Sequence, residues 1–139
     1  MNWFSWALLS AVFAGLTAVF AKVGVAEINS NLATAIRTTI VLLITWLIAA
    51  ATMKSGDLAG INRRTWLFLT LSAVATGLSW LCYFRALQLG EVSKVAPIDK
   101  LSVVIAIAIA VIALGERLDV REGIGAGFIV VGALLLAWK

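Results

Sequence analysis

Two opposite charges stand next to each other in an otherwise apolar stretch of the chain. Asp99 and Lys100 occur in "KVAPIDKLSVVIAIAIAVIALGERL", shortly after Pro97. A carboxylate inside such a segment can take up and release a proton, and an ammonium group can pair with it or with an anionic ligand. Each charge costs about 2.5–3.5 kcal/mol at the centre of a membrane helix, and less near its end. A coupling or binding role and a charge-paired helix start are both open interpretations.

The two charges fall on different helical faces. A step of 100° per residue places Asp99 on a face of small residues and Lys100 on a face of bulky ones. Small residues mark the face that a neighbouring helix approaches closely, so we expect the Asp99 face to be packed. The Lys100 face could meet lipid, with the ammonium reaching the headgroups. Pro97 suits the first turn of such a helix, where its missing N–H costs little. The small face comprises Ser102, Ala106, Ala110 and Ala113, and the bulky face comprises Val104, Ile107, Val111 and Leu114.

Other candidate residues lie in two further apolar segments. In one segment, threonine hydroxyls share a helical face with an arginine at its edge, and such hydroxyls either bond their own helix or contact a ligand. In the other, aromatic residues precede an arginine that closes the segment. Either arginine could pair with Asp99 or meet a substrate carboxylate. The predicted substrate-binding or coupling residues are Asp99, Lys100, Arg37, Thr34, Thr38, Trp80, Tyr83 and Arg85.

The elements that must position these residues are membrane spans. Of the 139 residues, 63% are apolar and 13% are charged, and the mean hydropathy is +1.06. A soluble domain carries about 25% charged residues, and a helix needs about 20 mostly apolar residues to cross a bilayer. We predict an all-α integral membrane protein with one domain, 1–139. Its five transmembrane helices are expected at about residues 3–25, 31–52, 65–87, 95–114 and 120–138.

The composition also argues against several classes of function. The sequence has no histidine, and its single cysteine, Cys82, lies in an apolar run. We therefore expect no catalytic residues, no metal site and no cofactor. The net charge of +4 is spread over short loops without a basic block, so nucleic acid is not an expected partner. No phosphate-binding loop is present that would indicate coupling to ATP.

The last span carries the packing signal "GIGAGFIVVG". Gly123 and Gly127 in this stretch form a GxxxG notch, which lets two helices approach closely. We predict a helix-packing role for both glycines, and for Pro97 in the preceding span, and a dimer contact at the notch.

The positive charges favour neither orientation in the membrane. One side holds five Lys or Arg residues, and the other holds four near span ends, or six when Arg37 and Lys100 are included. A chain with so little bias can insert both ways round. Dual topology is therefore predicted.

The final part of the chain resembles a known family. An "AP" helix start, a long Ile/Val/Ala span, "LGERL" and then "GIGAGFIVVGALLLA" resemble the end of an EamA-like domain of the drug/metabolite transporter superfamily. The opening "SWALLSAVFAGLTAVFAKVGV" and the central "WLCYFRALQLGEVSKVAPIDKLS" resemble the same domain, so the resemblance covers essentially the whole chain. Full-length relatives carry two five-helix units in opposite orientation, and this chain resembles the short, single-domain bacterial members.

The resemblance implies a secondary transporter, an exporter of small organic metabolites across the bacterial cytoplasmic (inner) membrane. The chain would be one half-unit of an inverted-repeat transporter, and its partner would be an antiparallel homodimer mate or another half-size chain. Membrane lipid and a small-molecule substrate are the other expected partners. Positive charges at span depth outnumber acids, which favours anionic or zwitterionic substrates.

Two alternative functions remain. A cation exporter that resembles the small-multidrug-resistance type would need a carboxylate deep in the first span. Here the first acid is Glu27, at the end of that span, which counts against this alternative. A non-transporting membrane scaffold, or a subunit of a lipid-carrier flippase, is the other.

Overall fold

The computed structural model describes residues 2–54, 56, 58 and 60–138, and the elements it forms there are α-helices. Within these residues, five segments are long and apolar enough to cross a membrane by length and composition. The predicted fold class is thus confirmed, with span ends within three residues of those expected from the sequence. The helices are α1 (Trp3–Gly24), α2 (Ser30–Thr52), α3 (Arg63–Leu89), α4 (Val92–Asp99), α5 (Leu101–Leu114) and α6 (Val120–Ala137), with α4 and α5 together forming the fourth span.

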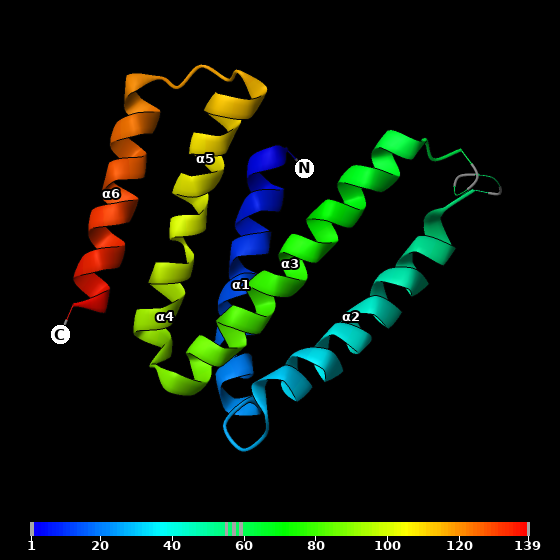
Figure 1. The fold of residues 1–139 in the computed structure, drawn as a ribbon, viewed down its shortest axis with the longest axis horizontal. Helices are drawn as coiled ribbons and strands as arrows, with labels where there is room; N and C mark the ends of the chain where they lie inside the picture. The colour runs from blue at the N-terminus through cyan, green and yellow to red at the C-terminus, as the bar shows by residue number, and fades with distance from the viewer. Residues whose placement is uncertain (1, 55, 57, 59, 139) are drawn as a thin grey trace. The chain divides into compact units, whose positions relative to one another are not determined.

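The chain divides into two parts, each of which is described by itself. The first part comprises residues 1–22 and 89–139, and the second comprises residues 23–88. In the first part α6 packs against both α4 and α5, and Figure 1 shows α5 and α6 running side by side. Lys22 Nζ also donates to the carbonyl of Gly90 at 2.8 Å. In the second part the Gln88 side chain donates to the carbonyls of Val25 and Ile28, at 3.2 and 2.7 Å. These bonds tie the end of α3 to the connection before α2.

Local sequence signals explain where several helices begin and end. Asn62 accepts from the backbone N–H of Thr65 at 2.8 Å and so caps the start of α3. Asp119 and Glu122 form a capping box at the start of α6. The Asp119 side chain accepts from the backbone N–H of Glu122, and the Glu122 side chain accepts from the backbone N–H of Asp119. Gly115, with φ of 69°, ends α5 in the left-handed conformation that glycine adopts without steric cost. The short connection between α5 and α6 is therefore well specified.

The fourth span is interrupted, contrary to the prediction for Pro97. The helix begins at Val92, so Pro97 lies in the interior of α4 rather than in the first turn. There it cannot donate to the Ser93 carbonyl, and its ring crowds that carbonyl. Three residues later the helix breaks at Lys100, whose N–H is shared between the carbonyls of Ala96 and Pro97 at 3.3 and 3.1 Å. The span therefore consists of two helices, α4 and α5, separated at one of the two charged residues (Figure 1).

The single chain covers neither predicted face of the fourth span as a whole. On the small-residue face Asp99 and Ala110 are half-buried, and Ser102, Ala106 and Ala113 are exposed. On the bulky face Val104 and Ile107 are half-buried, and Lys100, Val111 and Leu114 are exposed. Which face of this span is packed therefore stays a prediction.

The helix α6, which packs against α4 and α5, has several small residues among its covered positions. Gly123, Ala126, Ala133 and Ala137 are half-buried or buried. A Cβ added at Gly123 would lie 3.6 Å from Leu118 Cδ2, in the connection before α6. Gly127 is exposed, and a Cβ added there would meet no atom within 4 Å. The predicted packing roles of both glycines stay predictions.

Most large apolar side chains of the five spans are exposed in the single chain. The buried share of each span's most apolar window is between 0% and 11%. In a bilayer the surrounding lipid tails or another protein cover such surfaces, so this pattern is typical of membrane helices.

Candidate functional site

Arg37 holds a charge well inside a membrane span. It lies on α2 about 10 Å along the helix axis from Ser30, at about 1.5 Å per residue. Its guanidinium carbon lies 4.2 Å from the ring centroid of Trp80 and 5.6 Å from that of Phe84, both on α3. Phe84 is only 3% exposed, so the packing around it holds the ring in position beside the guanidinium. The two rings stabilise the cation through their negative faces.

The aromatic contacts leave the hydrogen-bonding capacity of Arg37 unused. Across residues 2–54, 56, 58 and 60–138, the guanidinium has no hydrogen-bond acceptor and no carboxylate within 4 Å. A guanidinium offers five N–H donors in a rigid fork that matches a carboxylate or phosphate. Inside a span, where water is scarce, such donors are a strong indication of an anionic ligand.

Three more predicted residues lie around Arg37 in the same part of the chain. The hydroxyl of Thr34 donates to the carbonyl of Ser30 at 2.8 Å, and that of Thr38 donates to the carbonyl of Thr34 at 2.7 Å. Their protons are thus committed to the helix, but each oxygen can still accept a bond from a ligand. Tyr83 interacts electrostatically with Arg37. The structure thus brings Arg37 into contact with Trp80, and Thr34 and Thr38 lie on the same helix as Arg37. These four residues and Tyr83 are called here the Arg37 cluster.

Arg85 belongs to a different arrangement in that part. Its Nη1 donates to Gln88 Oε1 at 2.9 Å, and Gln88 in turn binds two carbonyls of the connection before α2. Arg85 thus belongs to a hydrogen-bonded link between the end of α3 and that connection. Sequence reasoning missed Gln88, although an amide at the end of an apolar helix is a signal for such a link.

Asp99 and Lys100 pair with each other in the other part of the chain. Lys100 Nζ lies 3.4 Å from Asp99 Oδ2, and the two side chains are 56% and 34% exposed, respectively. They lie at the junction of α4 and α5, where the backbone of Lys100 stays in the right-handed helical region and its N–H is shared between two carbonyls. A discontinuous membrane helix near polar side chains is a common feature of transporter binding sites. The predicted roles of both residues remain predictions.

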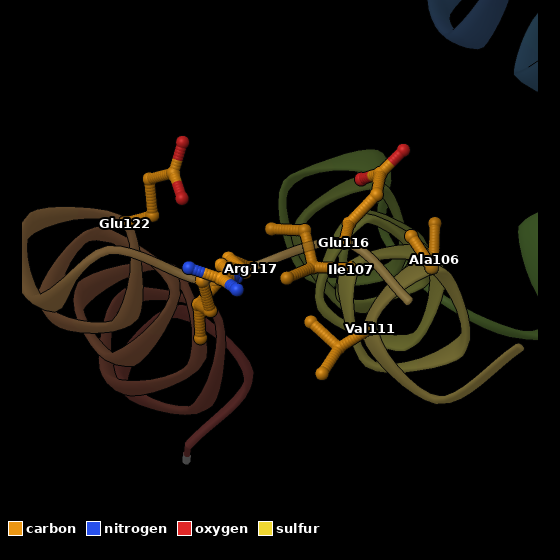
Figure 2. Close-up of a pocket in the computed structure, with 8 residues that line it drawn as sticks. Ala106, Ile107, Val111, Glu116, Arg117 and Glu122 are labelled. Carbon is orange, nitrogen blue, oxygen red and sulfur yellow. The ribbon is translucent and has the colours of Figure 1, made fainter. Parts of the chain in front are cut away.

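Sequence reasoning also missed a pocket between α5 and α6. Its volume is about 380 Å³, and its apolar wall leads to a charged rim made by Glu116, Arg117 and Glu122. Figure 2 shows this rim at the end where the two helices are joined. The sequence signal for this rim is the charge alternation in "LGERLDVRE". Among the described residues no group of His, Cys, Asp and Glu side chains is placed to hold a metal ion.

Comparison with known proteins agrees with this architecture. Residues 1–138 match the model of the EamA-like transporter family. The chain is also 57% identical over 136 residues to a protein of Sinorhizobium sp named "uncharacterized transporter in cobO 3′ region", which covers 98% of this chain and 96% of that protein. No solved structure gives a significant match.

Proposed function

The chain belongs to the EamA-like transporter family, and from that premise we propose that it exports small carboxylate-bearing metabolites as one half of an antiparallel dimer. It is a multi-pass membrane protein and not an enzyme, and the bacterial cytoplasmic membrane is the proposed location. The observation that carries the substrate class is the guanidinium of Arg37, which lies in a span and has no hydrogen-bond acceptor among the residues that the structure describes.

The Arg37 cluster offers each part of a small organic anion a suitable contact. The guanidinium can bind a carboxylate through two parallel N–H bonds, the strongest geometry available to such a pair. Trp80 and Phe84 hold the guanidinium from one side and so pre-orient the fork. The oxygens of Thr34 and Thr38 can accept bonds from a hydroxyl or ammonium group elsewhere on the ligand.

The proposed coupling group is Asp99, which lies beside the break in the fourth span. Its carboxylate is balanced by Lys100 at 3.4 Å, so a proton that binds Asp99 releases the lysine to pair elsewhere. The broken span provides a place where two helical segments can change their relative angle. A proton gradient would in this way drive export without ATP.

The antiparallel dimer is supported by three features of the chain. Five spans leave the two chain ends on opposite sides, so a second unit must be inverted to complete an inverted repeat. The nearly equal Lys and Arg counts on the two sides permit both insertions. The exposed small residues Ser102 and Ala113 of α5 lie outside the pocket between α5 and α6 and offer a close-packing surface for the second copy.

The experiment that tests the substrate class is a thermal-shift screen of the purified protein, followed by counterflow in liposomes. A carboxylate substrate should raise the melting temperature, because a ligand that binds the native state stabilises it. Arg37→Lys should weaken this ligand about tenfold or more, because it keeps the charge but loses the planar fork. The matched control is Arg64→Lys, which alters an arginine that lies 5.8 Å from the Phe68 ring at the start of α3.

The outcomes separate the alternatives. Stabilisation and counterflow by quaternary cations instead of carboxylates would favour a cation exporter of the small-multidrug-resistance type. Ligand binding without any counterflow would indicate a non-transporting scaffold or flippase subunit. Equal losses in Arg37→Lys and Arg64→Lys would remove the Arg37 cluster from the substrate site.

The experiment that tests the dimer is a carboxy-terminal reporter. It should be found on both sides of the membrane, and two or three lysines added between α1 and α2 should move it to one side. A wild-type reporter found wholly on one side would exclude the homodimer and leave a heterodimer with an oppositely inserted half-size chain.

A further inference from the structure

The pocket between α5 and α6 combines an apolar wall with a mixed-charge rim. The wall is formed by side chains on α5 and by Leu118 in the connection, and the rim by Glu116, Arg117 and Glu122. In Figure 2 the carboxylates of Glu116 and Glu122 point to the same side, and the Arg117 guanidinium lies toward the space between the two helices. The α5 part of the wall consists of Ala106, Ile107, Ala110 and Val111.

The charges of the rim do not neutralise one another. Over the described stretches of the chain, Arg117 has no ion pair within 4 Å with either carboxylate. Glu122 uses one oxygen, Oε2, to accept from the Asp119 backbone in the capping box, which leaves its other oxygen free. The rim thus offers acceptors for a cation next to donors for an anion. A ligand with both charges, an ammonium group and a phosphate, is complementary to it.

The wall decides between a lipid and a soluble ligand. It runs about 7.5 Å along α5, from Ala106 to Val111, and so lies alongside the apolar part of the span. A soluble zwitterion on the rim would leave this wall uncovered, whereas an acyl chain would cover it. The volume of about 380 Å³ holds a headgroup and the first part of a chain, but not a whole lipid. The rest of the lipid would remain in the bilayer.

We propose that this pocket binds an aminophospholipid, with its primary ammonium between Glu116 and Glu122, its phosphate on Arg117 and an acyl chain along α5. A primary ammonium carries three N–H donors, which suffices for both carboxylates, while a trimethylated ammonium carries none. The site therefore distinguishes phosphatidylethanolamine from phosphatidylcholine. The rim follows the end of α5 at Leu114, so a bound lipid would also hold the end of the fourth span that leads to α6.

The test measures lipid retention by the purified full chain in nanodiscs of defined composition, using native mass spectrometry and melting temperature. Phosphatidylethanolamine should be retained about tenfold more strongly than phosphatidylcholine or phosphatidylglycerol, because hydrogen bonds to charged groups are worth about that factor. Glu116→Gln and Arg117→Gln should each remove most of this preference. Glu122→Gln should do so without unfolding α6, since glutamine also serves in a capping box.

The controls make the outcome independent of transport. Glu27→Gln removes the same charge from an exposed position outside the pocket and should leave the preference unchanged. Equal retention of the ethanolamine and choline lipids, or equal loss in Glu27→Gln, would overturn the proposal. Full displacement of the lipid by soluble glycerophosphoethanolamine would also overturn it, because the pocket would then be a site for a soluble ligand.

Discussion

The chain places charges inside membrane spans in two regions, and it treats them differently. In the fourth span, Asp99 and Lys100 neutralise each other at a helix break and remain partly exposed. In α2, Arg37 lies on an uninterrupted helix against the rings of Trp80 and Phe84, and no carboxylate of the described residues lies within 4 Å of it. Both arrangements lower the free-energy cost of a charge in a span. They differ in what the charged group can still do: exchange a proton in the first case, and donate hydrogen bonds in the second.

The difference leads us to expect a different role in transport for each region, coupling for one and ligand recognition for the other. A self-paired carboxylate can exchange a proton and change its partner, which suits coupling. A cation held by aromatic faces keeps its hydrogen-bond donors, which suits recognition of an anion. We therefore expect variants of the Asp99 pair to change how transport is driven, and variants of the Arg37 cluster to change which ligand is bound and how tightly.

The largest expected effect follows from Asp99→Asn. This variant should abolish or uncouple transport while the chain still inserts, because asparagine keeps the shape but cannot be deprotonated. Lys100→Ala should change the dependence of transport on the proton gradient, because Asp99 then loses its countercharge, while ligand affinity stays near wild type. The measurement is transport per folded molecule in liposomes, with and without a proton gradient.

A purely structural pair would behave in another way. Both single variants would then lose folded protein, because each leaves an unpaired charge, and the double leucine variant would regain folded protein and full activity. That result would assign Asp99 and Lys100 to helix structure and leave the Arg37 cluster as the site.

The second prediction concerns the aromatic wall of Arg37. Trp80→Ala should weaken the carboxylate ligand about threefold to thirtyfold, the range expected for a desolvated cation–π contact. Trp80→Phe should restore part of the affinity. Trp46→Ala is the control, since Trp46 lines a separate apolar pocket of about 880 Å³ between α2 and α3. Melting temperatures in a carboxylate titration give the affinities, and an equal loss in both alanine variants would refute the distinct role of Trp80.

The third prediction concerns the break itself. Pro97→Ala restores an N–H that can bond the Ser93 carbonyl, so the fourth span should become straighter and the protein more stable, by up to about 3 kcal/mol. Transport should fall severalfold while carboxylate affinity stays the same, because the Arg37 cluster is unchanged. Unfolding in denaturant and initial transport rates measure the two effects. Unchanged transport in a stabilised variant would show that the break is not needed for the transport cycle.

The sequence predicted the spans well and their contacts poorly, for physical reasons. Apolar length alone determines a span, so the end of α2 at Thr52 and the start of α6 at Val120 match the expected bounds. The break at Lys100 was missed because the effect of a proline depends on where the helix starts, and the start lies three residues earlier than expected. The types of the site residues were predicted, but the 4.2 Å contact of Arg37 with Trp80 depends on how α2 meets α3. Periodicity within one helix does not contain that information.

The smallest expected effect within a single chain belongs to Gly127→Leu. A Cβ at Gly127 meets no atom within 4 Å, so the variant should fold and keep the packing of α6 against α4 and α5. Any loss would then arise in the contact with the second copy, where we expect weaker dimerisation because a large side chain holds the backbones apart. Gly125→Leu is a matched control. It also meets no atom within 4 Å, gains the same helix propensity, and lies about 200° around the helix from Gly127.

Crosslinking of the purified protein, as a function of its dilution in lipid, measures the dimer for both variants. If Gly127 contacts the second copy, Gly127→Leu should lower the dimer fraction while Gly125→Leu leaves it near wild type. Survival of both the crosslink and transport in Gly127→Leu would place that face against lipid. The part of the chain that holds Asp99 would then contact its partner through the exposed small residues of α5. Ala113→Leu, compared with Ala108→Leu on another face of the same helix, would test that surface.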